Sequence, residues 1–291
     1  MGSSKRQRTS GAPYPRAVHS SVAARRRVFA IAGVAVGCIA ALVIHSALAV
    51  GTRGATLRHV TIKSRFVHRS ERVTLVQPKG ASGGRPLLVF LHGRGDDGED
   101  SNVNGAFFKA LAALGERAPA VVFPNGGNHG YWHDRRGESW ARYVLDEVIP
   151  RAVKALHADP KRVAIGGISM GGFGALDIAR LHPHRFCAVG AHSPALWRTA
   201  GETAPGAFDD AQDFARHDVI AAARRNPNLY GTTPVWLDAG SADPFQPGDR
   251  ALDRALKTVR LHTYPGAHEN AYWRAHYRAY LRFYAAALAR C

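Results

Sequence analysis

A serine framed by glycines is the most distinctive chemical feature of the sequence. The stretch from Gly167 to Gly171 reads Gly-x-Ser-x-Gly, with Ser169 at its centre, and follows a short apolar run that ends near Ile165. An apolar-periodic segment, 173–181, comes directly after it. This order of strand, sharp turn and helix is typical of a nucleophile elbow, where small residues two positions before and after the serine let strand and helix approach closely. The serine hydroxyl then lies at a helix N-terminus, where the helix dipole favours developing negative charge, so Ser169 is predicted to be a nucleophile.

A serine hydroxyl needs a general base, and the chain has 15 histidines that compete for this role. His268 follows the expected last strand in a segment containing Pro and Gly, which break the strand before the next helix begins. The others fit less well: His262 lies within that strand, His276 on the following helix, and His182 and His184 at the end of the helix after the serine. We therefore expect His268 to be the base.

The acid of a triad should follow the penultimate strand, in the chain order Ser, Asp, His that this fold uses. The segment 237–244 offers two candidates, Asp238 and Asp243. Asp243 lies in the turn beyond the strand, from which it can orient the imidazole of the base. Asp238 lies at the strand end, where a carboxylate commonly caps a turn. The position favours Asp243 and leaves Asp238 as the alternative.

An oxyanion hole is expected from two backbone N–H groups. The sequence Leu-His-Gly-Arg-Gly at 91–95 follows an apolar strand, 87–91, at the position where this fold supplies half of the hole. Arg94 is the expected donor there, and Met170, directly after the nucleophile, is the other.

Two tryptophans, Trp132 and Trp140, follow the expected strand at 120–123, on the same edge of the sheet. They either line an acyl or alcohol pocket or pack a rigid loop, and the sequence leaves both open. The acidic cluster at 96–100 lacks the complete spacing of a calcium loop and is interpreted as a solvated loop. No metal or cofactor is expected.

A mainly parallel sheet must hold these residues, because short apolar runs alternate with helical patterns after an opening pair of strands. The predicted class is α/β, with helices on both faces and ligands at the carboxyl ends of the strands. The segment 194–230, rich in aromatic residues, is a candidate small cap. The expected strands are 60–67, 73–76, 86–91, 120–123, 163–165, 188–189, 235–237 and 259–264, and the expected helices are near 103–116, 140–157, 170–182, 246–256 and 271–288.

The N-terminal part divides from the rest at about residue 50. Residues 1–24 are polar and basic and are predicted to be a disordered cytoplasmic tail. Residues 25–50 begin with three arginines and continue as an apolar run of nearly membrane-spanning length, so the positive-inside rule places the catalytic domain, 51–291, outside the cytoplasmic membrane. An uncleaved signal anchor is favoured, and a cleaved signal peptide ending at Ala47-Leu48-Ala49 remains open.

The charge is strongly positive, +17 at neutral pH, but seven of the basic residues precede residue 50 and no acidic residue does. After residue 50 no run of basic residues interleaved with aromatics occurs, so nucleic acid is not an expected partner. The chain has three cysteines, which do not make a disulfide framework. A bond between Cys187 and Cys291 is conceivable after export, but Cys187 falls in an expected core strand and a buried free thiol is favoured.

Residues 86–284 resemble the esterase branch of the α/β-hydrolases that includes esterase D, feruloyl esterases and secreted mycolyltransferases. The resemblance implies an α/β-hydrolase fold, with Ser169 as nucleophile, Asp243 as acid and His268 as base. The opening Leu-His-Gly-Arg-Gly-Asp-Asp-Gly also resembles the phospholipase and carboxylesterase group, so the branch stays open. The motifs are LHG at 91–93, GISMGGFGAL at 167–176, AGSADPF at 239–245 and PGAHENAYW at 265–273.

The expected reaction is hydrolysis of carboxylic esters through an acyl-enzyme, acting on a small-molecule or lipid ester without a cofactor. The same residues would serve an acyltransferase that passes the acyl group to a sugar or lipid alcohol of the cell envelope, although no marker specific to mycolate transfer is recognised. A non-catalytic envelope-binding module is a third interpretation, and three triad residue types at their expected positions argue against it.

Overall fold

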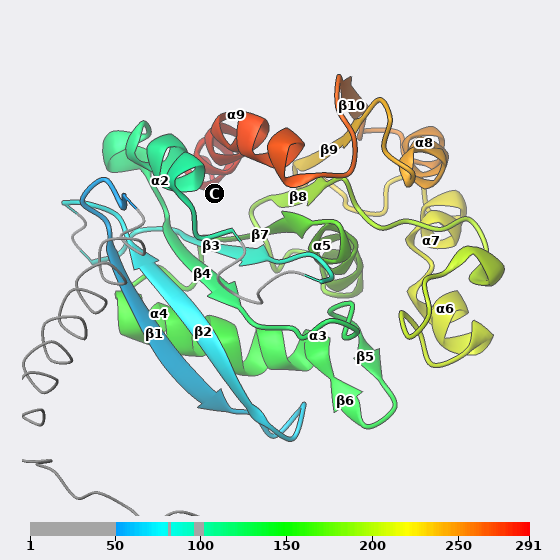
Figure 1. The fold of residues 1–291 in the computed structure, drawn as a ribbon, viewed down its shortest axis with the longest axis horizontal. Helices are drawn as coiled ribbons and strands as arrows, with labels where there is room; N and C mark the ends of the chain where they lie inside the picture. Colours follow the sequence, from blue (N-terminus) through cyan, green and yellow to red (C-terminus); the bar gives the residue numbers. More distant parts are fainter. Residues whose placement is uncertain (1–50, 81–82, 96–101) are drawn as a thin grey trace, which may run out of the picture. The chain divides into compact units, whose positions relative to one another are not determined.

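The computed structural model describes residues 51–80, 83–95 and 102–291 (Figure 1). The predictions for residues 1–24 and 25–50, and for the acidic cluster at 96–100, lie outside the described residues. Within the described ranges, no helix combines the length and apolar character needed to cross a membrane.

The core of the described part is an eight-stranded sheet with the order β1-β2-β4-β3-β7-β8-β9-β10. Strand β2 runs antiparallel to both β1 and β4, whereas the neighbours from β4 to β10 are parallel. The prediction of a mainly parallel central sheet is confirmed. The bounds are β1 Thr56–Lys63, β2 Ser70–Gln77, β3 Leu87–Leu91, β4 Ala120–Pro124, β7 Val163–Ile168, β8 Val189–His192, β9 Val235–Gly240 and β10 Leu261–Tyr264.

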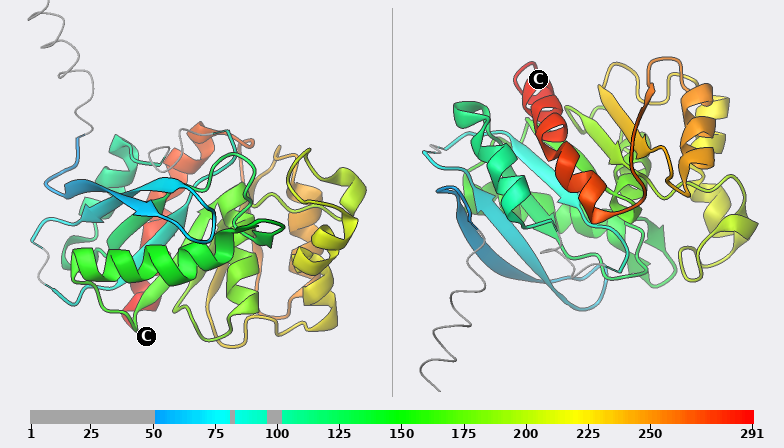
Figure 2. Two further views of the ribbon diagram at one scale, coloured as in Figure 1. Left: turned by 90° about the horizontal axis from the view of Figure 1, so that it is seen from below. Right: turned by 45° about the horizontal axis from the view of Figure 1, so that its top comes forward.

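Helices cover both faces of the sheet, as predicted (Figures 1 and 2). Alternate side chains of β3 divide between two cores, because successive residues of a strand point to opposite faces. Leu87, Val89 and Leu91 pack in the core that contains residues of α4 (Ile149–Leu156) and α5 (Met170–Leu181), and the intervening residues of β3 pack beneath α2 and α9. Helices α2 (Gly105–Ala112) and α9 (Asn270–Leu288) also contact each other.

The expected helix at 140–157 is present but is not uniform. Helix α3 (Trp140–Arg142) passes into a π-helical stretch, Tyr143–Val148, before α4 begins. The widened turn directly precedes Pro150, whose ring lacks an N–H and would clash with the carbonyl four residues earlier in a regular helix. Just before α3 lies a short hairpin of β5 (Asp134–Arg135) and β6 (Glu138–Ser139), which the sequence did not predict.

The segment 194–230 connects β8 to β9 and contains α6 (Ala211–His217) and α7 (Val219–Arg225). In Figure 1 α7 lies between α6 and α8 (Gln246–Ala255), and α7 contacts α8. Buried side chains of the segment, such as Trp197 and Phe214, belong to the same core as α5. The segment is therefore packed into the body of the domain.

The expectation of a free thiol at Cys187 is wrong, because Cys187 and Cys291 form a disulfide with a Cα–Cα distance of 5.7 Å. Cys187 does not lie within a strand but two residues before β8, on the connection from α5. Helix α9 crosses the sheet (Figure 2, right), and the residue Cys291 beyond its end is bonded to Cys187 on that connection.

Candidate active site

The turn between β7 and α5 holds Ser169 in a conformation that side chains rarely adopt, with φ 55° and ψ −115°. Its N–H donates to the carbonyl of His192 in β8 at 2.9 Å. The two glycines of the motif are needed here, since a Cβ on Gly167 or Gly171 would clash with the Leu91 carbonyl oxygen at the end of β3. Strain of this kind persists where surrounding structure holds it, and here it presents the hydroxyl at the start of α5.

Ser169, His268 and Asp243 form one chain of hydrogen bonds. His268 Nε2 lies 2.8 Å from Ser169 Oγ, and His268 Nδ1 lies 2.9 Å from Asp243 Oδ2. The Asp243 side chain is fully buried, and its other oxygen accepts from the Phe245 N–H at 2.9 Å. Asp243 can therefore hold the imidazole with Nδ1 protonated and Nε2 facing the hydroxyl, which is the arrangement a general base needs.

Two aromatic rings fix the imidazole of His268 from the sides. The Phe245 ring centroid lies 4.9 Å from that of His268, and the Trp273 ring stands edge-on at 5.1 Å. Neither aromatic residue was assigned a role from the sequence, although each lies within a motif that was singled out. A hollow beside Phe245 is lined by residues that include Trp197, Arg198 and Glu202.

Asp238, the alternative acid, forms hydrogen bonds with a different set of residues. Oδ1 accepts from His192 Nδ1 at 2.7 Å and from Trp236 Nε1 at 2.9 Å, and Oδ2 accepts from the hydroxyls of Tyr272 at 2.8 Å and Tyr280 at 2.7 Å. These four bonds occupy the acceptor sites of a carboxylate. Asp238 thus anchors a buried network between β8, β9 and α9 and does not cap the turn.

The expected oxyanion loop after β3 is held by the side chain of His92. Its Nε2 accepts from the Gly126 N–H at 2.9 Å, and its Nδ1 lies 2.7 Å from the Gly93 carbonyl oxygen. Burial lowers the pKa of His92 from 6.5 to about 4, so the ring is neutral at pH 7. The Met170 N–H is in the first turn of α5 and has no partner within that helix. The positions of Arg94 and Met170, at the ends of adjacent strands β3 and β7, suit two donors directed at one oxygen.

Trp132 and Trp140 are fully buried, which favours the loop-packing interpretation over the pocket-lining one. The Trp132 Nε1 donates to the His92 carbonyl at 3.2 Å, and the two indole rings meet edge-on at 6.3 Å. Tyr131, which the sequence did not single out, lies beside the Arg94 side chain. Tyr131 and Trp132 both have positive φ, at 45° and 60°. The two tryptophans therefore support the loop that carries the expected oxyanion donor.

A second buried carboxyl lies near the site. Asp249 in α8 is fully buried, and neither of its oxygens has a hydrogen-bond partner among the described residues. Burial, followed by the charges of Asp243 and Asp238, raises its pKa well above the usual value. Burial therefore favours the protonated form of Asp249 more than in an exposed aspartate.

Residues 64–284 match the family model described as "Putative esterase". The chain belongs to this esterase family. The resemblance found in the motifs is confirmed, and the residues matched include the serine, the histidine and both aspartates described above.

The similar proteins agree with the family. An esterase of Mycobacterium tuberculosis is 25% identical over 223 residues, which is 63% of this chain and 48% of that protein. The MPT51 antigen of Mycobacterium leprae is 27% identical over 170 residues, 57% of this chain and 54% of that protein. The chain thus spans about half the length of these curated relatives.

Solved structures share the fold at low identity. A ferulic acid esterase has a TM-score of 0.69 at 19% identity and covers 80% of this chain and 98% of its own. An S-formylglutathione hydrolase from Agrobacterium tumefaciens has a TM-score of 0.68 at 20% identity and covers 81% of this chain and 96% of its own. The α/β-hydrolase fold follows from this likeness.

Proposed function

We propose that the protein is a serine hydrolase that cleaves carboxylic esters through an acyl-enzyme intermediate. His268 takes the proton of Ser169 as the hydroxyl oxygen attacks the ester carbonyl, and Asp243 stabilises the imidazolium that forms. The N–H groups of Met170 and Arg94 stabilise the oxyanion. His268 then protonates the leaving alcohol, and a water activated by the same imidazole releases the acid.

One observation carries this proposal: the continuous hydrogen-bonded chain from Ser169 Oγ through His268 to Asp243, at 2.8 and 2.9 Å. Ser169 is the only residue of the three that needs activation, and its positive φ at the start of α5 is the conformation of a nucleophile elbow. The same geometry argues against a non-catalytic envelope-binding module, because binding alone does not require a serine in a strained conformation.

The substrate is proposed to be a small-molecule or lipid ester that enters beside Phe245. This residue contacts His268, and the adjoining hollow is lined by Leu196, Trp197 and Pro247 as well as by Arg198 and Glu202. A lining of apolar side chains with a few polar ones suits an acyl or alcohol group.

Acyl transfer to a sugar or lipid alcohol is the second candidate, and it uses the same three residues. It is favoured by the low exposure of Ser169, 8%, because a nucleophile shielded from water prolongs the life of an acyl-enzyme. Rates of hydrolysis and of transfer to glycerol or trehalose, measured on one ester, separate the two. Transfer that outpaces hydrolysis would replace the esterase proposal.

Export across the cytoplasmic membrane completes the proposal, with residues 25–50 as a signal peptide or signal anchor. The bond between Cys187 and Cys291 supports it, because disulfides persist in oxidising compartments and are rare in the cytosol. The N-terminal residue of the mature protein, determined by mass spectrometry, distinguishes cleavage after Ala49 from an uncleaved anchor. A mature protein located in the cytosol would contradict export.

Labelling of the full-length protein by a fluorophosphonate probe tests the catalytic proposal. The parent should be labelled and Ser169→Ala should not, and its kcat on p-nitrophenyl esters should fall on the order of a million-fold. Ser241→Ala is the matched control, since this exposed serine lies in the turn after β9 near the site. Labelling that survives Ser169→Ala, or a folded parent that is never labelled, would refute it.

A further inference from the structure

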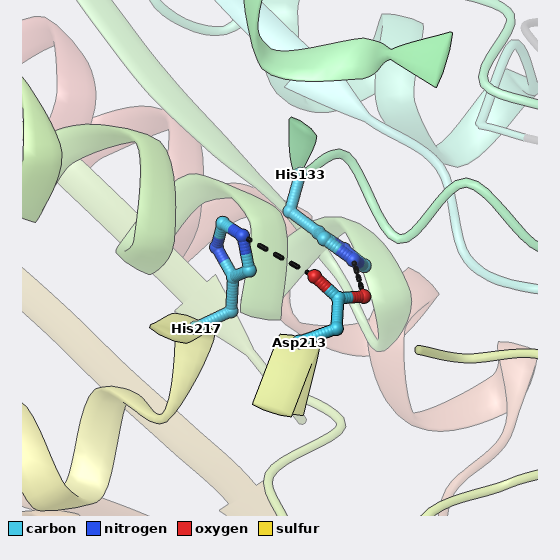
Figure 3. A group of neighbouring side chains, drawn as sticks. All are labelled: His133, Asp213 and His217. Carbon is cyan, nitrogen blue, oxygen red and sulfur yellow. Dashed lines mark hydrogen bonds and ion pairs between the residues drawn. The ribbon is translucent and has the colours of Figure 1, made fainter. Parts of the chain in front are cut away.

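Three buried side chains with metal-binding chemistry meet outside the catalytic site. His133, Asp213 and His217 lie close together, and each can offer a ligand atom within 4.8 Å of the others (Figure 3). His133 comes from the loop before β5, and the other two come from α6, one turn apart. His133 and Asp213 are fully buried, and His217 is 7% exposed.

We propose that these three residues bind a Zn²⁺ ion. Two imidazoles and a carboxylate are a ligand set that zinc favours in proteins, with a fourth position for water. The sequence did not predict this site, because its residues belong to no motif and His133 is 80 positions away from Asp213.

The distances suit an ion between the side chains. His217 Nε2 faces Asp213 Oδ1 at 3.8 Å, which is too far for a hydrogen bond. Two ligands about 2.0–2.1 Å from one tetrahedral zinc lie about 3.3 Å apart. His133 Nε2 lies 3.1 Å from Asp213 Oδ2, close to that same separation. Small movements of the side chains would therefore complete the coordination.

The outer partners of His217 resemble those of a metal ligand. Its Nδ1 lies 2.7 Å from Asp177 Oδ2 in α5, and Asp177 Oδ1 lies 2.6 Å from Arg180 Nη2. A carboxylate on one ring nitrogen fixes the tautomer, so that the other nitrogen keeps a lone pair for a metal. His217 Nε2, the atom turned toward Asp213, is then the nitrogen free to bind.

Asp213 also has other partners that an ion would meet, and its Oδ2 accepts from the Asp209 N–H at 2.9 Å. Arg216 Nη2 lies 2.9 Å from Asp213 Oδ1 and competes with a cation. The Arg216 side chain is 54% exposed and can turn into solvent when an ion binds.

His133 would bind the ion through Nε2, the ring nitrogen that faces Asp213. An ion held there would link α6 to the loop before β5 and, through Asp177, to α5.

Zinc binding by the untagged full-length protein in mild detergent tests the proposal. We expect one Zn²⁺ per chain by mass spectrometry of metals after dialysis against zinc-free buffer. Zinc at 100 times its Kd should raise the Tm by about 5–10 °C. Co²⁺ in its place should give the visible absorption bands of a tetrahedral site with nitrogen and oxygen ligands.

Variants assign the ion to this cluster. His133→Ala and His217→Ala should each weaken zinc binding by about 100-fold or more, and Asp177→Asn, which positions His217, by about 10-fold to 100-fold. His184→Ala, at an exposed histidine, should change nothing. Zinc that binds equally to all variants, or binds without tetrahedral Co²⁺ bands, would overturn the proposal. If the alanine variants do not fold, the Asp177→Asn affinity and the parent's Co²⁺ spectrum decide.

Discussion

Loss of the bond between Cys187 and Cys291 should destabilise the protein far more than its position at the chain end suggests. The bond closes a loop across a sequence separation of 104 residues. In the chain-entropy treatment, a loop of this length restricts the unfolded state by about 4.7 kcal/mol at 25 °C. Residual structure in the reduced unfolded chain makes this an upper value. For a domain of this size it corresponds to a fall in Tm of about 10–20 °C.

The assay is thermal unfolding followed by circular dichroism, with and without reductant. The parent in reductant and the double variant Cys187→Ser, Cys291→Ser should unfold at the same lowered temperature, and reductant should not shift the double variant. Cys38→Ser is the control that removes the third cysteine. Equal Tm values for the parent with and without reductant, or two alkylatable thiols in unreduced Cys38→Ser, would refute the reasoning.

Three further predictions concern the site and its buried groups. Asp243→Asn should lower kcat about 10⁴-fold with little loss of stability, whereas Asp238→Asn should mainly lower the Tm; kcat and Tm measured on both variants check this. The pKa of His92, about 4 when folded and 6.5 when unfolded, means that stability present above pH 6.5 is lost as the pH falls toward 4. This loss is about 3 kcal/mol, and it should be absent from His92→Gln in urea titrations at pH 7 and pH 4. Burial raises the folded pKa of Asp249, so its contribution favours folding at low pH and is lost as the pH rises. Asp249→Asn should therefore have a higher Tm than the parent at pH 8 but not at pH 4. The control Asp146→Asn, at a half-exposed aspartate, should not have a higher Tm than the parent at pH 8.

The sequence by itself was sufficient for features that depend on local geometry. The tight turn at Ser169 requires glycines two residues before and two residues after the serine. The motif therefore predicts this turn without knowledge of the rest of the fold. Apolar runs that alternate with helical patterns likewise predicted a mainly parallel sheet and the positions of its main strands along the chain. Short or irregular elements were missed, because β5, β6, α6 and α7 have too few residues to show a period.

The sequence favoured Asp243 over Asp238 from their positions relative to the strand, and only the tertiary structure shows the partners of each. Asp238 and Asp243 are five residues apart, and what separates them is the partners brought by β8 and α9: Asp238 receives His192 and two tyrosines, and Asp243 meets His268. The disulfide also depends on where α9 ends, which no local pattern contains.

The same reason explains His133, Asp213 and His217, which come together from the loop before β5 and from α6. A turn motif depends on residues that are adjacent in the chain, so it can be recognised from the sequence alone. A buried cluster, an ion pair or a disulfide is determined by packing between segments far apart in sequence. For this protein, the sequence predicted Ser169 and His268 and favoured Asp243, and the packing of the sheet and helices brings these three side chains into one hydrogen-bonded chain.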